Sequence, residues 1–302
     1  MLITNYIHRA IILLLLTASS SHLVFAQSDS TAIQQKSPWK LDGTYMFNIS
    51  ESTFTNWVAG GTNQIGLATI LKPHFVYDNG KLSWSTEIDI RYGLQKQQNS
   101  KSRKTEDVLK LETKLGKRLS EDWKFSGLYT ISTQFSPSMD GDVLNSAFAA
   151  PAYTNLSLGF DYNPKPQLSI YMTPGNIRST YVFNDTLSSQ GAFGVSPGKK
   201  YLIKFGPSFL IGYKGELLKN FLVDTKLGVF MNVLDGLGNP VVNWDAIITM
   251  KINRYLATTF AANLFFDPDS KVNIYDADGV VTGKVAKIQF KQSIGFGVNI
   301  KW

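Results

Sequence analysis

The chain of 302 residues contains no cysteine and only three histidines. The absence of cysteine excludes disulfide bonds, thiolate nucleophiles and cysteine-based metal sites. No window shows the periodicity of an amphipathic helix, and no linker or shift in composition divides the chain into two domains. The formal charge of +7 is spread along the sequence, without a basic run interleaved with aromatic residues, so we expect no nucleic-acid partner.

Long hydrophobic runs are also missing. The apolar run near the start, Ala10–Leu16, is far shorter than the ~20 residues of a membrane-spanning helix. Arg9 precedes this run and the small-residue exit Val24-Phe25-Ala26 follows it, which predicts a signal peptide over residues 1–26, cleaved after Ala26, in preference to a transmembrane anchor. Residues 27–38 would then be a periplasmic N-terminal tail without a core to join.

The sequence instead shows the two-residue alternation of β-strands, most clearly over Ala286–Trp302. One face of this stretch is polar or glycine, and the other carries Phe290, Ile294, Phe296, Val298, Ile300 and Trp302. Such a strand suits lipid on one side and water on the other. Its aromatic ending resembles the terminal strand by which bacterial outer-membrane barrels are recognised and inserted. The resemblance implies that these six residues are an assembly signal and that the barrel-insertion machinery is a partner.

The alternation recurs through residues 39–302 as about twelve strands, within a range of about ten to fourteen, joined by alternately short and long connections. This pattern predicts one all-β domain, an antiparallel transmembrane β-barrel with long extracellular loops and short periplasmic turns. Four tryptophans would then form a girdle near the periplasmic rim: Trp39, Trp84, Trp123 and Trp302. A soluble β-sandwich also alternates, but seldom combines strands this long with aromatic strand ends. The least regular strand begins at Leu168, because Pro174-Gly175 interrupts it.

One connection stands out by composition, the stretch Phe54–Asn63 between the first two strands. Its candidate contact residues for a partner or ligand are Phe54, Asn56, Trp57, Gly60, Gly61 and Asn63. The alternative is a loop that packs its own tryptophan into the barrel mouth. The Asn-Trp-x-x-Gly-Gly segment, with the barrel pattern, resembles an uncharacterised family of bacterial outer-membrane proteins known as a domain of unknown function. That resemblance implies the barrel fold but no activity or cofactor.

Candidate catalytic residues are few. His74 faces inward on the second strand, and a two-residue turn at Asn79-Gly80 would pair Tyr77 with Leu82 and place His74 opposite Ser85, with Glu87 diagonal to it. Nucleophilic acyl chemistry would need such a Ser-His pair with a carboxylate nearby. These residues lie near the periplasmic turn, however, which favours a polar packing role for His74. The run Asp276–Gly279 lacks the glutamate of a calcium loop and predicts a hairpin tip. We therefore expect no enzyme activity, metal or cofactor.

These patterns predict a protein exported to the bacterial outer membrane and leave three functions open. The first is a non-enzymatic structural or interaction component, as a subunit of a larger assembly with other outer-membrane proteins or lipoproteins. The second is a small passive channel with a preference for anions, because basic groups dominate the charges assigned to the lumen. The third is a membrane-embedded hydrolase, which the single histidine of the mature chain argues against.

Overall fold

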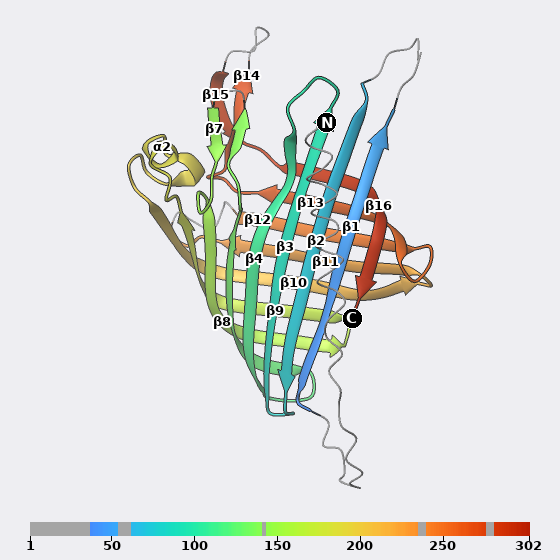
Figure 1. Cartoon of the computed structure of the whole chain (residues 1–302). Helices are drawn as coiled ribbons and strands as arrows, with labels where there is room; N and C mark the ends of the chain where they lie inside the picture. The colour runs from blue at the N-terminus through green and yellow to red at the C-terminus, as the bar shows by residue number, and fades with distance from the viewer. Residues whose placement is uncertain (1–36, 54–61, 141–142, 235–239, 276–280) are drawn as a thin grey trace, which may run out of the picture. The chain divides into compact units, whose positions relative to one another are not determined.

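The computed structural model describes residues 37–53, 62–140, 143–234, 240–275 and 281–302. Within these ranges, twelve strands form a closed antiparallel barrel (Figure 1). Each strand pairs with its neighbours along the chain, and the last pairs with the first. The strands are β1 (Trp39–Ser52), β2 (Gln64–Asp78), β3 (Leu82–Gln97), β4 (Arg103–Arg118), β5 (Trp123–Thr133), β8 (Ala152–Lys165), β9 (Leu168–Tyr181), β10 (Tyr201–Leu218), β11 (Phe221–Met231), β12 (Pro240–Lys251), β13 (Leu256–Phe266) and β16 (Gln289–Lys301). The predicted fold class and strand number are confirmed.

The two ends of the barrel differ, as the sequence predicts. One end, here the turn end, holds the short connections 79–81, 119–122, 166–167, 219–220 and 252–255. The other, the loop end, holds the longer connections and the remaining elements: the hairpins β6–β7 (Ser138–Asp140, Val143–Ser146) and β14–β15 (Lys271–Tyr275, Val281–Ala286), helix α2 (Asp185–Ser189) and a 3-10 helix (Ala192–Gly194). Residues 1–36, which include the expected signal peptide and most of the expected tail, lie outside the described residues.

The helix of the loop end is held by polar contacts at its start. Asn184 accepts a hydrogen bond from the Leu187 N–H at 3.0 Å, as an N-cap residue does. Asp185 lies 2.8 Å from the Lys200 ammonium, whose hydrogen bond and charge hold the pKa of that carboxyl below its usual value. These contacts order a connection that the sequence indicates only as a loop.

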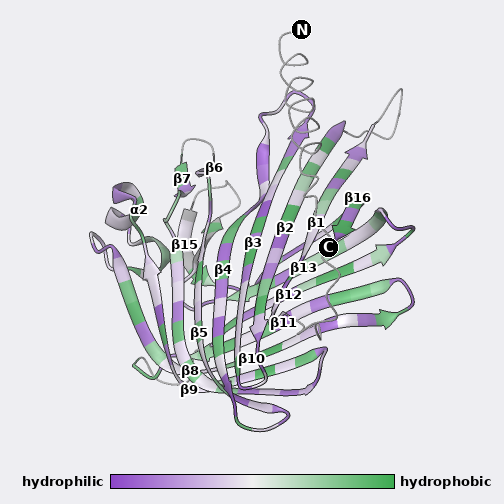
Figure 2. Cartoon of the chain, turned by 60° about the horizontal axis from the view of Figure 1, so that its bottom comes forward, coloured by the Kyte–Doolittle hydropathy of each residue, from purple (hydrophilic) through white to green (hydrophobic). Residues whose placement is uncertain are grey.

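Two faces alternate along each strand, which Figure 2 shows as bands of contrasting hydropathy. On the outside, β1 and β16 place Tyr45 beside Ile300 and Ile49 beside Phe296. The predicted assembly residues lie on this outer face, where Phe290, Ile294, Phe296, Ile300 and Trp302 are exposed and Val298 is half-buried. The strand itself begins at Gln289 and not at Ala286, because Ala286 ends β15 and pairs with Lys271. The period alone could not separate two extended segments that follow each other so closely.

The four tryptophans lie at the turn end. The Trp39 ring is 5.0 Å from that of Tyr77 and 5.7 Å from that of Trp84, and the Trp123 ring stacks on Tyr162 at 4.7 Å. Trp302 is held by a glycine: Gly43 and Trp302 exchange backbone hydrogen bonds of 3.1 and 3.3 Å. A Cβ at Gly43 would lie only 2.3 Å from the indole ring, so glycine is what lets Trp302 lie against β1.

The irregular strand contains a bulge. Leu158 of β8 pairs with Gly175 of β9 and Phe160 with Met172, so the single residue Gly159 faces the two residues Thr173 and Pro174. The pairing on the β10 side shifts at the same place. Here Thr173 donates a hydrogen bond from its hydroxyl to the Leu158 carbonyl at 2.7 Å. The bulge absorbs the proline, and pairing continues to Tyr181. The strand predicted from Leu168 is therefore confirmed.

The turn at Asn79-Gly80 is wider than predicted. Tyr77 pairs with Trp84 and Asp78 with Ser83, so the two strands slide by two residues relative to the predicted pairing of Tyr77 with Leu82. The Asn79 side-chain oxygen accepts the N–H groups of Lys81 at 3.0 Å and Leu82 at 2.8 Å, which stabilises a longer loop. A slip of two residues preserves the faces, so the inward and outward sets of β3 remain as predicted.

Ile88, on the outer face near the middle of β3, tests this face assignment. It lies beside Leu111 of β4. Ile88→Arg should lower the free energy of unfolding in lipid by about 2–4 kcal/mol, the cost of arginine at the bilayer midplane. Urea titration of protein refolded into vesicles measures this loss, with Ile88→Leu as the control that keeps the site apolar. Equal stabilities of the two variants would show that Ile88 does not face lipid.

Candidate functional site

Most of the predicted contact site, residues 54–61, lies outside the described residues, so Phe54, Asn56, Trp57, Gly60 and Gly61 stay predictions. Asn63 is described, and its carbonyl accepts a hydrogen bond from the Gln98 N–H at 2.8 Å. This contact ties the base of the connection between β1 and β2 to the connection between β3 and β4.

His74 is not part of a Ser-His pair. The longer hairpin turn places His74 opposite Glu87, and Ser85 opposite Val76, so the predicted pairing of His74 with Ser85 is wrong. Its Nδ1 lies 3.2 Å from a carboxylate oxygen of Asp42 on β1. His74 therefore has the polar packing contact in the lumen that the sequence favoured over catalysis.

Ion pairs cross the lumen from one wall to the other. Lys226 of β11 contacts Glu112 of β4, and these strands are separated by four others on the shorter way around the barrel. Two further pairs have the same separation: Lys72 to Asp224 at 3.8 Å, and Lys214 to Glu87 at 3.9 Å. The walls can meet because β1–β4 run steeply in Figure 1 while β10–β13 run nearly across them. Side chains thus span the interior of the barrel.

Buried side chains occupy part of the lumen between its middle and the turn end. Lys114 of β4 lies 2.7 Å from the buried Asp161 of β8 and 4.9 Å from the centre of the Tyr171 ring. On the other side, Met46 of β1 and Ile70 of β2 form a buried apolar cluster with Ile247 of β12.

A cavity of 450 Å³ occupies the loop half of the lumen. Glu112 and Lys226, near the middle of β4 and β11, belong to its lining. Lys110 and Asp89 line it as well. Nearer the loop end its lining includes Arg178, which contacts Asp267 at 3.2 Å. The cavity is thus a charged pocket whose lining includes one of the ion pairs that cross the lumen, Lys226 with Glu112.

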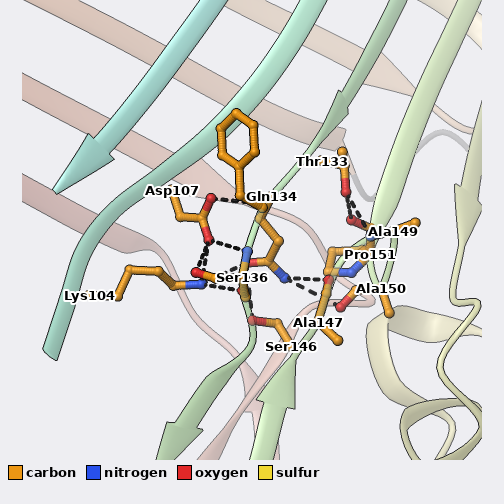
Figure 3. A network of polar contacts seen from close by, with 11 residues as sticks. Lys104, Asp107, Thr133, Gln134, Ser136, Ser146, Ala147, Ala149, Ala150 and Pro151 are labelled. Atoms are coloured by element: carbon orange, nitrogen blue, oxygen red, sulfur yellow. Dashed lines mark hydrogen bonds and ion pairs between the residues drawn. The ribbon is translucent and has the colours of Figure 1, made fainter. Parts of the chain in front are cut away.

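A polar network fastens the loop end at the ends of β4 and β5 (Figure 3). Both oxygens of the Asp107 carboxylate accept backbone N–H groups, from Phe135 at 2.7 Å and from Ser136 at 3.0 Å, and the Lys104 ammonium lies 2.6 Å away. Gln134 donates to the Ala147 carbonyl at 3.1 Å. Fixed donors from the chain surround this carboxylate, so the network anchors the connection that carries β6 and β7.

No group of three or more residues among those described could hold a metal ion. No helix in the described part of the chain is long and apolar enough to cross a membrane.

A closed antiparallel barrel with an apolar outer face, an aromatic girdle and a polar interior has the architecture of bacterial outer-membrane β-barrels. The sequence model of DUF3078, a protein of unknown function, matches residues 49–138, from the end of β1 to the start of β6. The resemblance to an uncharacterised family, inferred from the sequence, is confirmed over this segment.

Solved structures with a similar fold include an outer-membrane channel from Pseudomonas putida F1, with 12% identity, TM-score 0.40, and coverage of 92% of this chain and 100% of that one. The translocator domain of the autotransporter NalP from Neisseria meningitidis has 10% identity and TM-score 0.35, over 99% of this chain and 97% of that one. Outer membrane phospholipase A from Escherichia coli has 10% identity and TM-score 0.32, over 91% and 94%. A comparison with curated protein sequences finds no match. Scores this low say nothing about activity, so the function must be argued from the chain's own residues.

Proposed function

We propose that this chain is a non-enzymatic β-barrel of the bacterial outer membrane, exported by a cleaved signal peptide, that acts as a structural or interaction component and as a subunit of a larger assembly. The observation that carries this proposal is the set of ion pairs across the lumen, above all Lys226 with Glu112. Opposite charges held across the barrel oppose free passage of water and ions, and they brace the two walls against each other.

The outer face supports the membrane location. Large apolar side chains such as Leu158, Ile203 and Leu115 are more than half exposed on it, and a membrane would cover them. The rings of Trp39 and Trp84 at the turn end fit the interfacial girdle of such barrels. Lipid of the outer membrane is therefore a proposed partner, together with the insertion machinery and other outer-membrane proteins or lipoproteins.

The inner face supports the absence of enzymatic activity. His74 faces Asp42 and Glu87, and a serine nucleophile is not in register with it. A hydrolase would need another base, and the mature chain has no second histidine.

A small passive channel with anion preference is the second candidate, and the 450 Å³ cavity favours it. The lining includes five basic side chains (Arg91, Lys110, Arg178, Lys226 and Lys291) against four acidic ones (Asp89, Glu106, Glu112 and Asp245). A path through this cavity would have to displace the ion pair between Lys226 and Glu112.

Planar-bilayer recording separates the two candidates. We expect the purified, folded protein to give no stable conductance, and the double variant Glu112→Ala, Lys226→Ala to conduct because the bridge across the lumen is gone. An anion-selective reversal potential of the variant in a salt gradient is expected from the basic excess, and cation selectivity would refute the lumen assignment. Stable conductance by the unmodified protein would favour the channel. Copurification from gently solubilised membranes should recover partner proteins if the chain is a subunit.

A further inference from the structure

The barrel is closed by its shortest pairing. β1 pairs with β2 along its whole length, from Trp39 to Ser52, but with β16 only from Thr44 to Ile49. On the other side, β16 pairs with β13 from Gln289 to Val298, so its half from Gln289 to Gly295 has a strand on one side only, as far as the described residues show. Two strand edges therefore diverge in the loop half of the wall. We call this place the β1–β16 seam.

A second cavity, of 470 Å³, lies at the seam. Its lining comes from both edges, with Ile49 and Ser50 of β1 and Ser293 and Ile294 of β16. The set combines the two faces of the wall, because Ile49 and Ile294 belong to the outer, exposed face and Ser293 to the inner one. The cavity therefore lies between the two strand edges, with lining residues from both faces of the wall.

The seam cavity adjoins the lumen cavity. Three charged residues line both, namely Arg91, Glu106 and Lys291. Lys291 of β16 reaches across the lumen to Glu106 of β4, with its ammonium 2.6 Å from the carboxylate. The Lys291 side chain is 46% exposed and that of Glu106 is 11% exposed, so the ammonium is the accessible member of the pair. Basic groups also exceed acidic ones in the seam lining, where Lys104 is the third cation.

We propose that the β1–β16 seam is a lateral binding site for an anionic amphiphile with one acyl chain, which enters from the lipid with its chain between Ile49 and Ile294 and its acidic head at Lys291. This inference rests on the proposed membrane location. It is independent of whether the lumen conducts ions.

The chemistry of the seam argues for this ligand. Apolar side chains stand on the lipid side and an accessible ammonium stands behind them, which matches a molecule with a tail and an anionic head. A volume of 470 Å³ is at the small end of the ~300–1,000 Å³ of ligand pockets, which favours one acyl chain over a two-chain lipid. Backbone N–H and C=O groups without hydrogen-bond partners are costly in lipid, so a strand edge of this length needs polar groups or water beside it. A cavity that holds the acidic head group and water would supply these hydrogen-bond partners.

Binding of dansyl-labelled undecanoic acid to the refolded full-length protein in detergent tests the proposal. We expect saturable fluorescence enhancement that lauric acid displaces and that neither dodecyltrimethylammonium nor the two-chain lipid phosphatidylglycerol displaces. Lys291→Gln should weaken binding by about tenfold or more, since a hydrogen bond to a charged partner is lost. Ser293→Trp, which fills the seam, should abolish it, and Ser50→Trp repeats the test from the other edge. Lys40→Gln, at an exposed lysine of the turn end, should leave binding unchanged.

Heat-modifiable migration on gels shows that each variant is folded, which keeps a failure of the barrel fold distinct from a failure of binding. Unchanged affinity in folded Lys291→Gln and in both tryptophan variants would overturn the seam site. Displacement by the cationic detergent as well as by lauric acid would overturn the role of Lys291. Displacement by phosphatidylglycerol would replace the single-chain ligand by a membrane phospholipid.

Discussion

Deleting Gln289–Trp302 should abolish folding of the barrel. The deletion removes β16, which pairs with β13 on one side and β1 on the other, and it removes the Trp302 ring that lies against Gly43. Both neighbouring strands would then carry unpaired backbone groups along their length, a cost that a bilayer does not tolerate. The measurement is heat-modifiable migration on gels after refolding into detergent, where the truncated chain should run as unfolded protein at every temperature.

The matched control is deletion of residues 271–286, a segment of similar length. It removes the hairpin β14–β15, which pairs within itself and supplies no strand to the barrel. This variant should keep the heat-modifiable band. A folded, protease-resistant protein without β16 would show that the closing strand is dispensable and would contradict the closed-barrel topology.

Asp89→Asn should destabilise the barrel by about 3–5 kcal/mol, the usual cost of removing one partner from a buried ion pair. Asp89 is buried in the lumen, where Arg91 donates two hydrogen bonds to its carboxylate, at 2.9 and 2.5 Å, and the Lys72 ammonium lies 3.4 Å away. The asparagine keeps the shape but removes the negative charge beside Arg91 and leaves Lys72 only its longer contact with Asp224, at 3.8 Å. Equilibrium urea unfolding, followed by tryptophan fluorescence, measures the loss.

Asp185→Asn provides the comparison. Asp185 also contacts a lysine, but in an exposed connection at the loop end, where water replaces the lost interaction. We expect no measurable change in stability there. Equal effects of the two substitutions would mean that Asp89 is far more hydrated than its buried position indicates.

The strands could be predicted from the sequence because each has one apolar and one polar face. The pairs Tyr45–Ile300 and Ile49–Phe296 join apolar residues from the two ends of the barrel sequence, on the side where the alternation puts them. Position along the strand was harder. The Asn79 side chain closes a longer turn than the Asn-Gly pair suggests, and a slip of two residues leaves no trace in an alternating pattern. The misplaced pairing of His74 follows from that single hydrogen-bonded turn.

The ion pairs across the lumen could not be predicted, although their residues could. Glu112 and Lys226 both belong to the inward set by their alternation, yet their contact depends on how closely the two walls of the barrel approach each other. That shape comes from twist and bulges around the whole sheet, such as the bulge at Pro174, and not from local pattern. The Asp107 network was missed for another reason: its donors are mostly backbone N–H groups, which sequence does not distinguish.

The short pairing of β1 with β16 also bears on how the chain folds. Every other pair of neighbouring barrel strands is joined by a single connection of the chain, so these pairs form between segments close in sequence. Thr44–Ile49 and Phe296–Lys301 are separated by almost the whole barrel sequence, and their meeting carries the largest loss of chain entropy. We therefore expect the pairing of β1 with β16 to form last during folding and to open first during unfolding. Amide hydrogen exchange should be fastest there among the barrel strands. Local opening of the barrel wall would then occur at the β1–β16 seam, where the two strand edges already diverge.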